Sequence, residues 1–195
     1  MQQVLNDIKK QLVQNPKRPF LIAIDGNCGS GKTTLGSFLK EQLHASLFHM
    51  DDFFLQPHQR TEERLSAPGG NVDYERFQQE ILDHVTDDAG ITYRPYSCKH
   101  RKLADAVTEP YHDIIIIEGS YSHHPYFKDI YDLKIFLEIP PEEQKKRIIN
   151  RAGEAVWPVF REKWIPLENQ YFEAMKIREN SDVSYCFLSI LRVQS

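Results

Sequence analysis

FLIAIDGNCGSGKTTL, residues 20–35, is the stretch that decides the fold of this chain. Gly26, Gly31, Lys32 and Thr33 fill the spacing G-x-x-x-x-G-K-[ST], which is the pattern of the phosphate-binding P-loop. Glycines allow the backbone to curl so that successive N–H groups face one anion, and the positive end of a following helix strengthens that field. The pattern therefore predicts a nucleotide phosphate site that uses the whole loop: Gly26, Asn27, Cys28, Gly29, Ser30, Gly31, Lys32, Thr33 and Thr34.

Apolar residues on both sides give this loop the context that a P-loop requires. Residues 21–24 form an apolar run typical of a buried strand, and apolar side chains recur at helical spacing over 35–43. In this setting the Lys32 ammonium is expected to bind the β- and γ-phosphates, and the Thr33 hydroxyl is placed to ligate Mg²⁺. The alternative is a flexible glycine-rich turn without a ligand.

Length, charge and cysteine content narrow the class of protein. A chain of 195 residues is expected to form one domain, and a net charge of −4 without a Lys/Arg-rich block argues against nucleic acid as a partner. No apolar run reaches the roughly 18 residues of a membrane span, and the first residues show no signal-peptide pattern. We therefore expect a cytoplasmic protein without a membrane partner, and its three widely spaced cysteines are expected to be free thiols.

Apolar periodicity along the chain predicts alternating strands and helices. Residues 114–117 are four consecutive isoleucines, which is typical of a strand buried on both faces. Further strands are expected at 45–50, 91–96, 133–139 and 183–190, helices at 1–13, 73–85, 142–152 and 157–177 with a break at Pro166, and a loop at 56–71.

The predicted order of elements indicates a single domain over residues 1–195. We expect the three-layer α/β sandwich of P-loop NTPases, with a mostly parallel central sheet, helices on both faces and a lid helix. The lid is expected over about 142–165, and an insert for the second substrate over about 52–112.

Two of the predicted strands end in carboxylates. Asp51 and Asp52 follow the strand at 45–50, and a carboxylate at the end of a strand beside the P-loop strand points into the nucleotide cleft. Asp51 is our candidate for the acid that orients or deprotonates an attacking hydroxyl. Which of the two adjacent acids works stays open, and so does a purely turn-forming role for the pair.

Glu118 follows the four isoleucines, where a P-loop protein places a second carboxylate near the metal. Thr33, Asp51 and Glu118 are therefore candidate ligands of Mg²⁺, which prefers hard oxygens and keeps several waters. A capping role is the alternative for Glu118. The next residue is Gly119, and the lack of a second acid there favours transfer to a bound hydroxyl over hydrolysis by water.

Arg147 and Arg151 are spaced i, i+4 after a Pro-Pro break, so they share one face of a helix. In a kinase lid, guanidinium groups at this place would neutralise the charge that spreads over the transferring phosphoryl oxygens. The two arginines join Lys32 and Asp51 as catalytic candidates. A solvated basic face shared with neighbouring lysines fits the pattern about equally well.

Tyr96, His100 and Arg101 lie in the predicted insert and are candidates for contacts to the second substrate. An excursion above the strand ends of an open α/β sheet lies where such a substrate binds. His123 and His124 are adjacent and therefore point in different directions on regular structure, which argues against a metal site there.

Taken together, these residues resemble the uridine kinase and phosphoribulokinase group of P-loop kinases. The resemblance covers most of the chain through seven segments: AIDGNCGSGKTTL, MDDFF, NVDYERF, RPYSCKHRK, IIIIEGS, IFLEIPPEEQKKRIINR and SDVSYCF. It implies a kinase that uses ATP and Mg²⁺ and phosphorylates a small hydroxyl-bearing metabolite. A pyrimidine nucleoside, uridine or cytidine converted to the 5′-monophosphate, is the leading acceptor.

The same resemblance assigns roles to individual residues. Asp51 corresponds to the family's catalytic aspartate, Glu118 to a metal-side glutamate, and Asp73 to the acid that grips the ribose hydroxyls. Tyr96 and His100 fall where uridine kinases contact the pyrimidine base, and the two lid arginines fall in the lid helix.

Departures from the family pattern concern the acceptor pocket. Phe54 stands where uridine kinases usually have tyrosine, Val72 where they have an aromatic residue, the Tyr-to-His spacing is shorter, and the lid has fewer arginines. The segments DDFF and VWPVF also resemble nicotinamide riboside kinases, so that acceptor, or a related sugar or vitamin, stays open. The sequence also leaves open GTP as the donor and assembly into a homo-oligomer.

A regulatory GTPase or ATPase module is the competing class of protein. The chain has no N-K-x-D base-reading motif, and its D-x-x-G match at 87–90 follows a predicted helix instead of a buried strand. These two observations favour the kinase.

Overall fold

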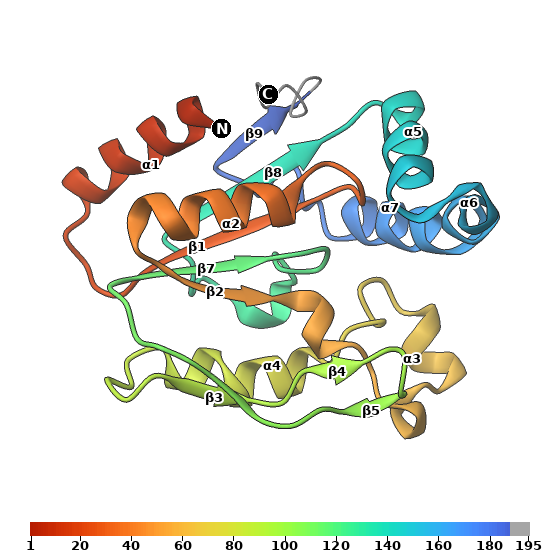
Figure 1. Cartoon of the computed structure of the whole chain (residues 1–195), viewed down its shortest axis with the longest axis horizontal. Helices are drawn as coiled ribbons and strands as arrows, with labels where there is room; N and C mark the ends of the chain where they lie inside the picture. The colour runs from red at the N-terminus through yellow and green to blue at the C-terminus, as the bar shows by residue number, and fades with distance from the viewer. Residues whose placement is uncertain (188–195) are drawn as a thin grey trace.

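The computed structural model describes residues 1–187, and a parallel five-stranded sheet lies at its centre (Figure 1). The strand order is β2-β7-β1-β8-β9, so the strand that leads into the P-loop is the middle one. The sheet strands are β1 Phe20–Gly26, β2 Ser46–His49, β7 Ile114–Glu118, β8 Leu133–Glu138 and β9 Val183–Cys186. The helices are α1 Gln2–Gln14, α2 Lys32–Leu43, α3 Glu62–Ser66, α4 Tyr74–Glu80, α5 Pro141–Ala152, α6 Trp157–Val159 and α7 Ile165–Ala174.

Short elements complete the chain. The insert between β2 and β7 holds the strands β3 Ile91–Tyr93, β4 Tyr96–Ser97, β5 Lys102–Leu103 and β6 Val107–Glu109. Single helical turns are η1 Met50–Phe53, η2 Pro57–Gln59, η3 Leu82–His84, η4 Pro125–Phe127, η5 Glu154–Val156 and the π-helical η6 Phe160–Trp164. The last predicted strand reaches Cys186, and residues 188–190 of that prediction lie outside the described residues.

The isoleucine strand β7 is buried on both faces, as its sequence predicts. Ile115 and Ile117 point into one apolar core, and Ile114 and Ile116 point into the other. β7 pairs in parallel with β2 on one side and with β1 on the other. Neither face of such a strand meets water, which explains why polar residues do not alternate with apolar ones along β7.

Helices α1 and α2 cover one face of the sheet. Val4, Leu5 and Ile8 of α1 and Leu35 and Leu39 of α2 are fully or almost fully buried in that core. The spacing of these residues places them on single helical faces, which accounts for both helices.

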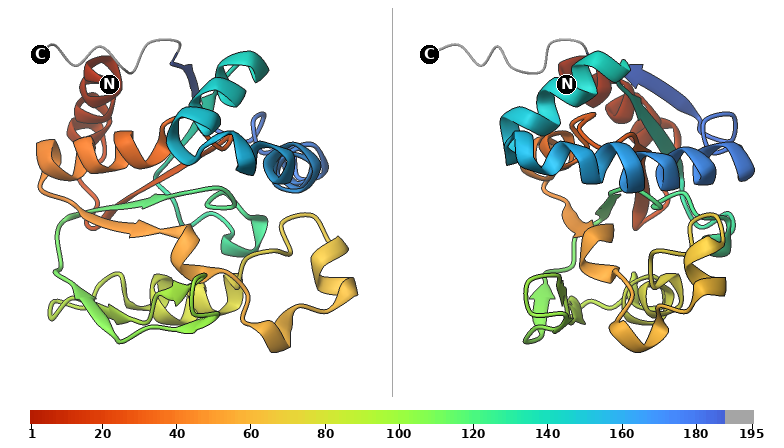
Figure 2. Two further views of the ribbon diagram at one scale, coloured as in Figure 1. Left: turned by 45° about the vertical axis from the view of Figure 1, so that its right-hand side comes forward. Right: turned by 90° about the vertical axis from the view of Figure 1, so that its right-hand side faces the viewer.

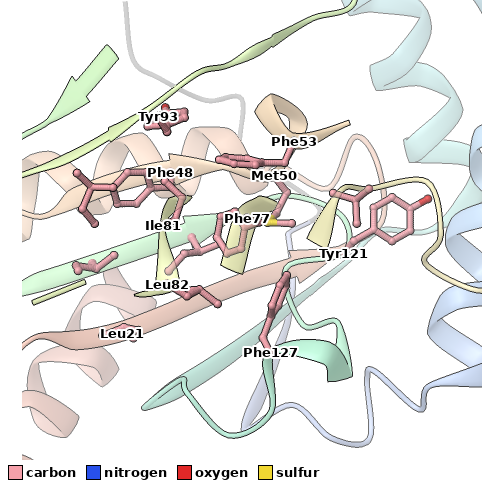
Figure 3. Packing of buried hydrophobic residues seen from close by; sticks show 14 of the residues in the cluster. Leu21, Phe48, Met50, Phe53, Phe77, Ile81, Leu82, Tyr93, Tyr121 and Phe127 are labelled. Carbon is pink, nitrogen blue, oxygen red and sulfur yellow. The ribbon is translucent and has the colours of Figure 1, made fainter. Parts of the chain in front are cut away.

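The other face of the sheet packs against the insert and α7. Side chains of β2, α4 and the turn after β7 meet there in an aromatic-rich core (Figure 3). Phe53 and Phe77 pack edge to face with ring centroids 4.9 Å apart, a geometry that aromatic rings favour. This core fixes the insert to the sheet next to the strand ends: Phe48, Phe53, Phe77, Ile81, Leu82 and Phe127 are among its members.

The insert differs in detail from the predicted strand and loop. The expected strand at 91–96 is divided at Pro95, because β3 pairs with β6 while β4 pairs with β5. A proline cannot donate to a ladder, which explains the division. The expected loop at 56–71 contains η2 and α3, and the Thr61 side chain caps α3 by accepting a hydrogen bond from the Arg64 N–H.

The predicted break at Pro166 takes a different form. The chain stays helical through this residue, which lies in the first turn of α7 where a missing N–H is tolerated. The irregularity lies just before it, in η6, where the N–H of Ile165 bonds to the carbonyl of Phe160 five residues earlier. Within residues 1–187, none of the helices combines the length and apolar character that crossing a bilayer requires.

Candidate active site

A cavity of about 830 Å³ lies where β1, β2 and β7 end. Its walls come from the P-loop, from the residues after β2 and β7, from the insert, and from α5 and the helical run of η6 and α7. The carboxyl ends of parallel strands at a change in strand order are the usual ligand site of open α/β sheets. The volume suits two small ligands side by side.

The P-loop connects β1 to α2 at one end of this cavity. A Cβ atom on Gly26 would lie 2.1 Å from the carbonyl oxygen of Leu137, so only glycine fits here. The Lys32 side chain is 8% exposed, and its Nζ donates to the carbonyls of Gly26 at 2.6 Å and Asn27 at 3.0 Å. The loop therefore curls around its own lysine, and the N-terminus of α2 opens into the cavity.

Six of the nine predicted loop residues line the cavity, and the other three form the back of the loop. The lining residues are Cys28, Gly29, Gly31, Lys32, Thr33 and Thr34. Ser30 is fully buried, and Asn27 is half-buried. The backbone of these three can still shape the loop, because the N–H of Ser30 bonds to the carbonyl of Asn27.

The two acids after β2 have different surroundings. Asp51 lines the cavity, whereas Asp52 accepts a hydrogen bond from the Tyr93 hydroxyl at 3.1 Å. Asp51 is exposed at the cavity surface, but the protein around it still removes much of its hydration and raises the pKa of its carboxyl. Lys32 opposes this shift of the pKa, and Glu118 adds to it. Its raised pKa and its place at the cavity wall suit Asp51 to accepting a proton there.

Glu118 ends β7 directly beside β2 and lines the cavity. Its Oε1 lies 2.5 Å from Nδ1 of His49, and this hydrogen bond raises the pKa of the imidazole. Sequence reasoning missed His49. The only signal in the sequence is its place two residues before Asp51, at the end of the same strand.

The oxygen atoms at this end of the cavity fit a hydrated Mg²⁺ ion. The Thr33, Asp51 and Glu118 side chains all border the cavity. Residues 1–187 contain no group of three or more His, Cys, Asp or Glu side chains that could hold a metal ion alone. Mg²⁺ in nucleotide sites needs only one or two carboxylates, because waters and substrate phosphates complete its shell.

Glu168 and Asp25 are buried carboxylates that sequence reasoning missed. Glu168, in α7, accepts hydrogen bonds from the Cys28 N–H at 2.9 Å and from the Ser120 hydroxyl at 2.5 Å, so it joins the lid side of the cavity to the P-loop. Asp25 accepts from the Tyr171 hydroxyl at 2.8 Å. Asp25 lies in the P-loop segment but outside its fixed positions, Glu168 belongs to none of the quoted segments, and the contacts of both join distant parts of the chain.

The two predicted lid arginines have different contacts. The Arg147 guanidinium donates to the carbonyls of Gly29 at 3.3 Å and Ser30 at 3.4 Å, and pairs with Glu143. Arg151 is exposed and lines the cavity without an ion-pair partner among the described residues. Arg147 thus supports the loop and also lines the cavity, and Arg151 has its charge free to face a ligand.

The predicted acceptor residues separate into two groups. Phe54, Tyr96 and Arg101 line the cavity. Asp73 does not, because it is 2% exposed, caps α4 through the Arg76 N–H, and accepts from Gln59 at 2.8 Å. His100 is exposed outside the cavity lining and bonds to Ser97.

Sequence reasoning also missed several other residues that line the cavity. Arg60, Asn71, Cys98, Phe160 and Trp164 also line the cavity. Phe160 and Trp164 belong to the unusual π-helical η6, for which the sequence offers only Pro166 as a signal. The histidines that we did not expect to bind metal have structural partners: His123 contacts the carbonyl of Ala23, and His124 stacks on Tyr74.

Known proteins similar to this chain include uridine kinases. No protein-family profile matches it. It is 29% identical to the uridine kinase of Bacillus subtilis over 181 residues, which cover 82% of this chain and 83% of that protein. It is 28% identical to the uridine kinase of Ureaplasma parvum over 186 residues, covering 87% and 89%. A solved structure described as a possible uridine kinase from Bacillus stearothermophilus has a TM-score of 0.67 at 21% identity, covering 93% of this chain and 96% of that one.

The chain is similar to uridine kinases over most of its length, and its fold is that of P-loop kinases. The predicted fold class is confirmed by the parallel sheet and by this structural likeness. The predicted enzyme class, an ATP-dependent phosphotransferase, is confirmed by the relatives and the fold. P-loop kinases of this kind generally use ATP and Mg²⁺. The roles of single residues in this uridine kinase-like protein, and its acceptor, stay predictions.

Proposed function

We propose that this protein transfers the γ-phosphoryl group of ATP to a hydroxyl of a small metabolite, with a pyrimidine nucleoside as the acceptor and its 5′-monophosphate as the product. One observation carries the proposal. A single cavity of about 830 Å³ is lined by the P-loop, by the strand-end carboxylates Asp51 and Glu118, and by aromatic side chains of the insert and of η6.

The residues have distinct parts in the proposed reaction. The P-loop N–H groups and Lys32 bind the phosphates of the donor. Thr33 and Glu118 would hold Mg²⁺, which neutralises charge on the β- and γ-phosphates when bound. Asp51 accepts the proton of the attacking hydroxyl, and its raised pKa suits this step. Arg151, free at the cavity wall, is placed to face the charge of the transferring group.

The nucleoside acceptor is supported by two kinds of observation. Curated relatives over most of the chain length are named uridine kinases. Phe54 and Tyr96 line the cavity beyond the carboxylates, where the ring of a nucleoside would lie if its 5′-hydroxyl approached Asp51.

The test is ADP release from ATP and Mg²⁺ with a panel of acceptors: uridine, cytidine, nicotinamide riboside, pantothenate and simple pentoses. Turnover with uridine and cytidine supports the proposal. Turnover with another acceptor alone would support a kinase and contradict the assignment of a pyrimidine nucleoside as the acceptor. ADP release that needs no acceptor counts against a kinase and in favour of a nucleotide-hydrolysing module.

A further inference from the structure

The π-helical segment η6 borders the cavity, and we call the part of the cavity next to the insert its acceptor end. Its defining bond joins the N–H of Ile165 to the carbonyl of Phe160, which places one more residue in this turn than an α-helix holds. An extra residue rotates the preceding part of a helix by about 100° relative to the part that follows. Phe160 and Trp164, the two ends of the segment, both line the cavity.

Contacts of the same helical run show which end of the cavity it covers. A smaller cavity of about 310 Å³ lies between this run and the insert, with Leu65 and Asn71 on one side and Lys163 and Pro166 on the other. The Gln170 side chain also donates to the carbonyl of Ser66 at 3.4 Å. The run from α6 to α7 thus lies over the insert (Figure 2), and its side chains Phe160 and Trp164 line the main cavity.

The insert supplies the opposite wall. Phe54 forms an isolated antiparallel bridge with Val72, which brings Asn71 beside it. The Arg60 guanidinium lies 5.8 Å from the centre of the Tyr96 ring. Aromatic side chains therefore reach the acceptor end both from the insert and from the helical run above it.

The polar groups at this end are hydrogen-bond donors. Arg60 and Arg101 have no carboxylate within ion-pair distance among residues 1–187. Asn71 is 8% exposed, and its side-chain amide makes no hydrogen bond to any part of the chain that the structure describes. Two of the three carboxylates that line the cavity have partners at the P-loop and the strand ends: Glu168 accepts from the Cys28 N–H, and Glu118 bonds to His49.

We propose that Phe160 and Trp164 are specificity-determining residues that stack on a planar, uncharged ring of the acceptor, whose ring oxygens accept hydrogen bonds from Arg60, Arg101 and Asn71. This inference rests on the proposed kinase function and narrows its acceptor. A pyrimidine with oxo groups matches these donors, whereas the cationic ring of nicotinamide riboside is repelled by the two arginines. An acceptor without a ring leaves the aromatic side chains unused.

Tryptophan fluorescence tests the contact without any turnover. The chain has two tryptophans, and Trp157 does not line the cavity, so Trp157→Phe leaves Trp164 as the sole reporter. Uridine and cytidine are titrated into this variant, with ribose as the ringless control. We expect saturable quenching by both nucleosides and none by ribose. Equal responses to all three, or no quenching by either nucleoside, overturn the proposal.

Steady-state kinetics test the role in specificity. Base–aromatic stacking predicts that Trp164→Ala raises the KM for the nucleoside about 5- to 100-fold, with the KM for ATP within about twofold of wild type. Trp164→Phe should recover most of the loss, and Trp157→Ala is the matched control. Matched melting temperatures check that the variants fold. A rise in the KM for ATP alone, or no change in either KM, overturns the proposal.

The two proposals fail in different ways. If the wild type phosphorylates none of the panel, the proposed function fails, and quenching of Trp164 still decides whether a ring binds there. If the wild type phosphorylates uridine and Trp164→Ala does so with an unchanged KM, the function stands and the stacking inference falls.

Discussion

The Nδ1 atom of His49 lies 2.5 Å from Oε1 of Glu118, and the two residues are register partners at the ends of the parallel strands β2 and β7. This hydrogen bond orients the Glu118 carboxylate, which we propose as a metal ligand. His49 itself directly precedes the turn that carries Asp51. Groups that orient metal ligands in this way affect metal affinity and rate as much as many ligands do.

His49→Ala should therefore raise the Mg²⁺ concentration needed for half-maximal activity by about tenfold or more. The fold should persist, because His49 is only half-buried at the edge strand of the sheet. Titration of activity against Mg²⁺ measures the change, and His44→Ala, on the exposed C-terminus of α2, is the control. An unchanged Mg²⁺ requirement would show that Glu118 needs no such support.

Asp51→Asn should leave ATP binding nearly intact and lower turnover about 100-fold or more, because an amide cannot accept the hydroxyl proton. Equilibrium binding of an ATP analogue and kcat with the best acceptor are the two measurements. Asp52→Asn is the matched control, since Asp52 faces the Tyr93 hydroxyl and not the cavity. Equal loss of binding and turnover in Asp51→Asn would remove the proposed role.

Gly26→Ala should unfold or severely destabilise the protein, by about 3 kcal/mol or more. The new methyl group would meet the backbone of β8 at 2.1 Å from the Leu137 oxygen, where a positive φ of 137° also disfavours a side chain. Urea denaturation gives the free energy of unfolding. Gly153→Ala is the control, because it has a positive φ too but no atom within 4 Å of the added carbon.

Arg64 holds the insert together through several contacts at once. Its guanidinium makes two bonds of 2.7 Å to Glu75, donates to the carbonyls of Gly70 and Val72, and lies 3.8 Å above the Tyr74 ring. Arg64→Ala should cost about 2–3 kcal/mol of unfolding free energy. Arg64→Lys should recover little of it, because an ammonium cannot make the planar fork. Full recovery by lysine in urea denaturation would contradict this reading.

His124 should make the free energy of unfolding fall as the pH is lowered. Burial is the main cause that lowers the pKa of its imidazole to about 4, and the positive charge of Arg64 adds to the shift. Its Nδ1 also accepts a hydrogen bond from the Tyr126 N–H, which protonation would break. In the unfolded chain the group protonates near pH 6.5, so the unfolded state binds the extra proton first as the pH falls.

This contribution to stability is therefore complete above about pH 6.5 and is lost as the pH falls from there to about 4, by about 2–3 kcal/mol. His124→Phe keeps a ring against Tyr74 and should flatten the slope of unfolding free energy in that window. His58→Gln, on the exposed η2 turn, should leave the slope unchanged. An identical slope in wild type and His124→Phe would assign the pH dependence to other groups.

Local patterns predict the fold of this protein well, because its determining features are local. The P-loop spacing and the run of four isoleucines each specify a backbone shape and a burial pattern within one segment. Asp51 and Glu118 could be placed at the cavity for the same reason: each directly follows a predicted strand, and parallel strands end at one edge.

The rest of the candidate site depends on contacts between distant segments. Glu168 reaches the P-loop through a hydrogen bond to Cys28, 140 residues away, and no pattern near either residue announces it. Asp73 carries a family motif, yet Gln59 and Arg76 enclose its carboxylate outside the cavity lining. Phe160 and Trp164 begin and end a π-helical turn, which apolar periodicity alone does not reveal.

The position of Lys32 has a consequence for the affinity with which the enzyme binds its nucleotide. With its ammonium bonded to the carbonyls of Gly26 and Asn27, the charge that a triphosphate needs is already present inside the loop. A nucleotide that enters the loop competes with those two carbonyls for the Lys32 ammonium. Part of the attraction between ammonium and phosphate is therefore offset by the loss of the two hydrogen bonds to the carbonyls. Measured affinity will therefore report a difference between two satisfied states of the same cation, and a lysine-to-methionine variant would lower both the affinity for nucleotide and the stability of the empty loop.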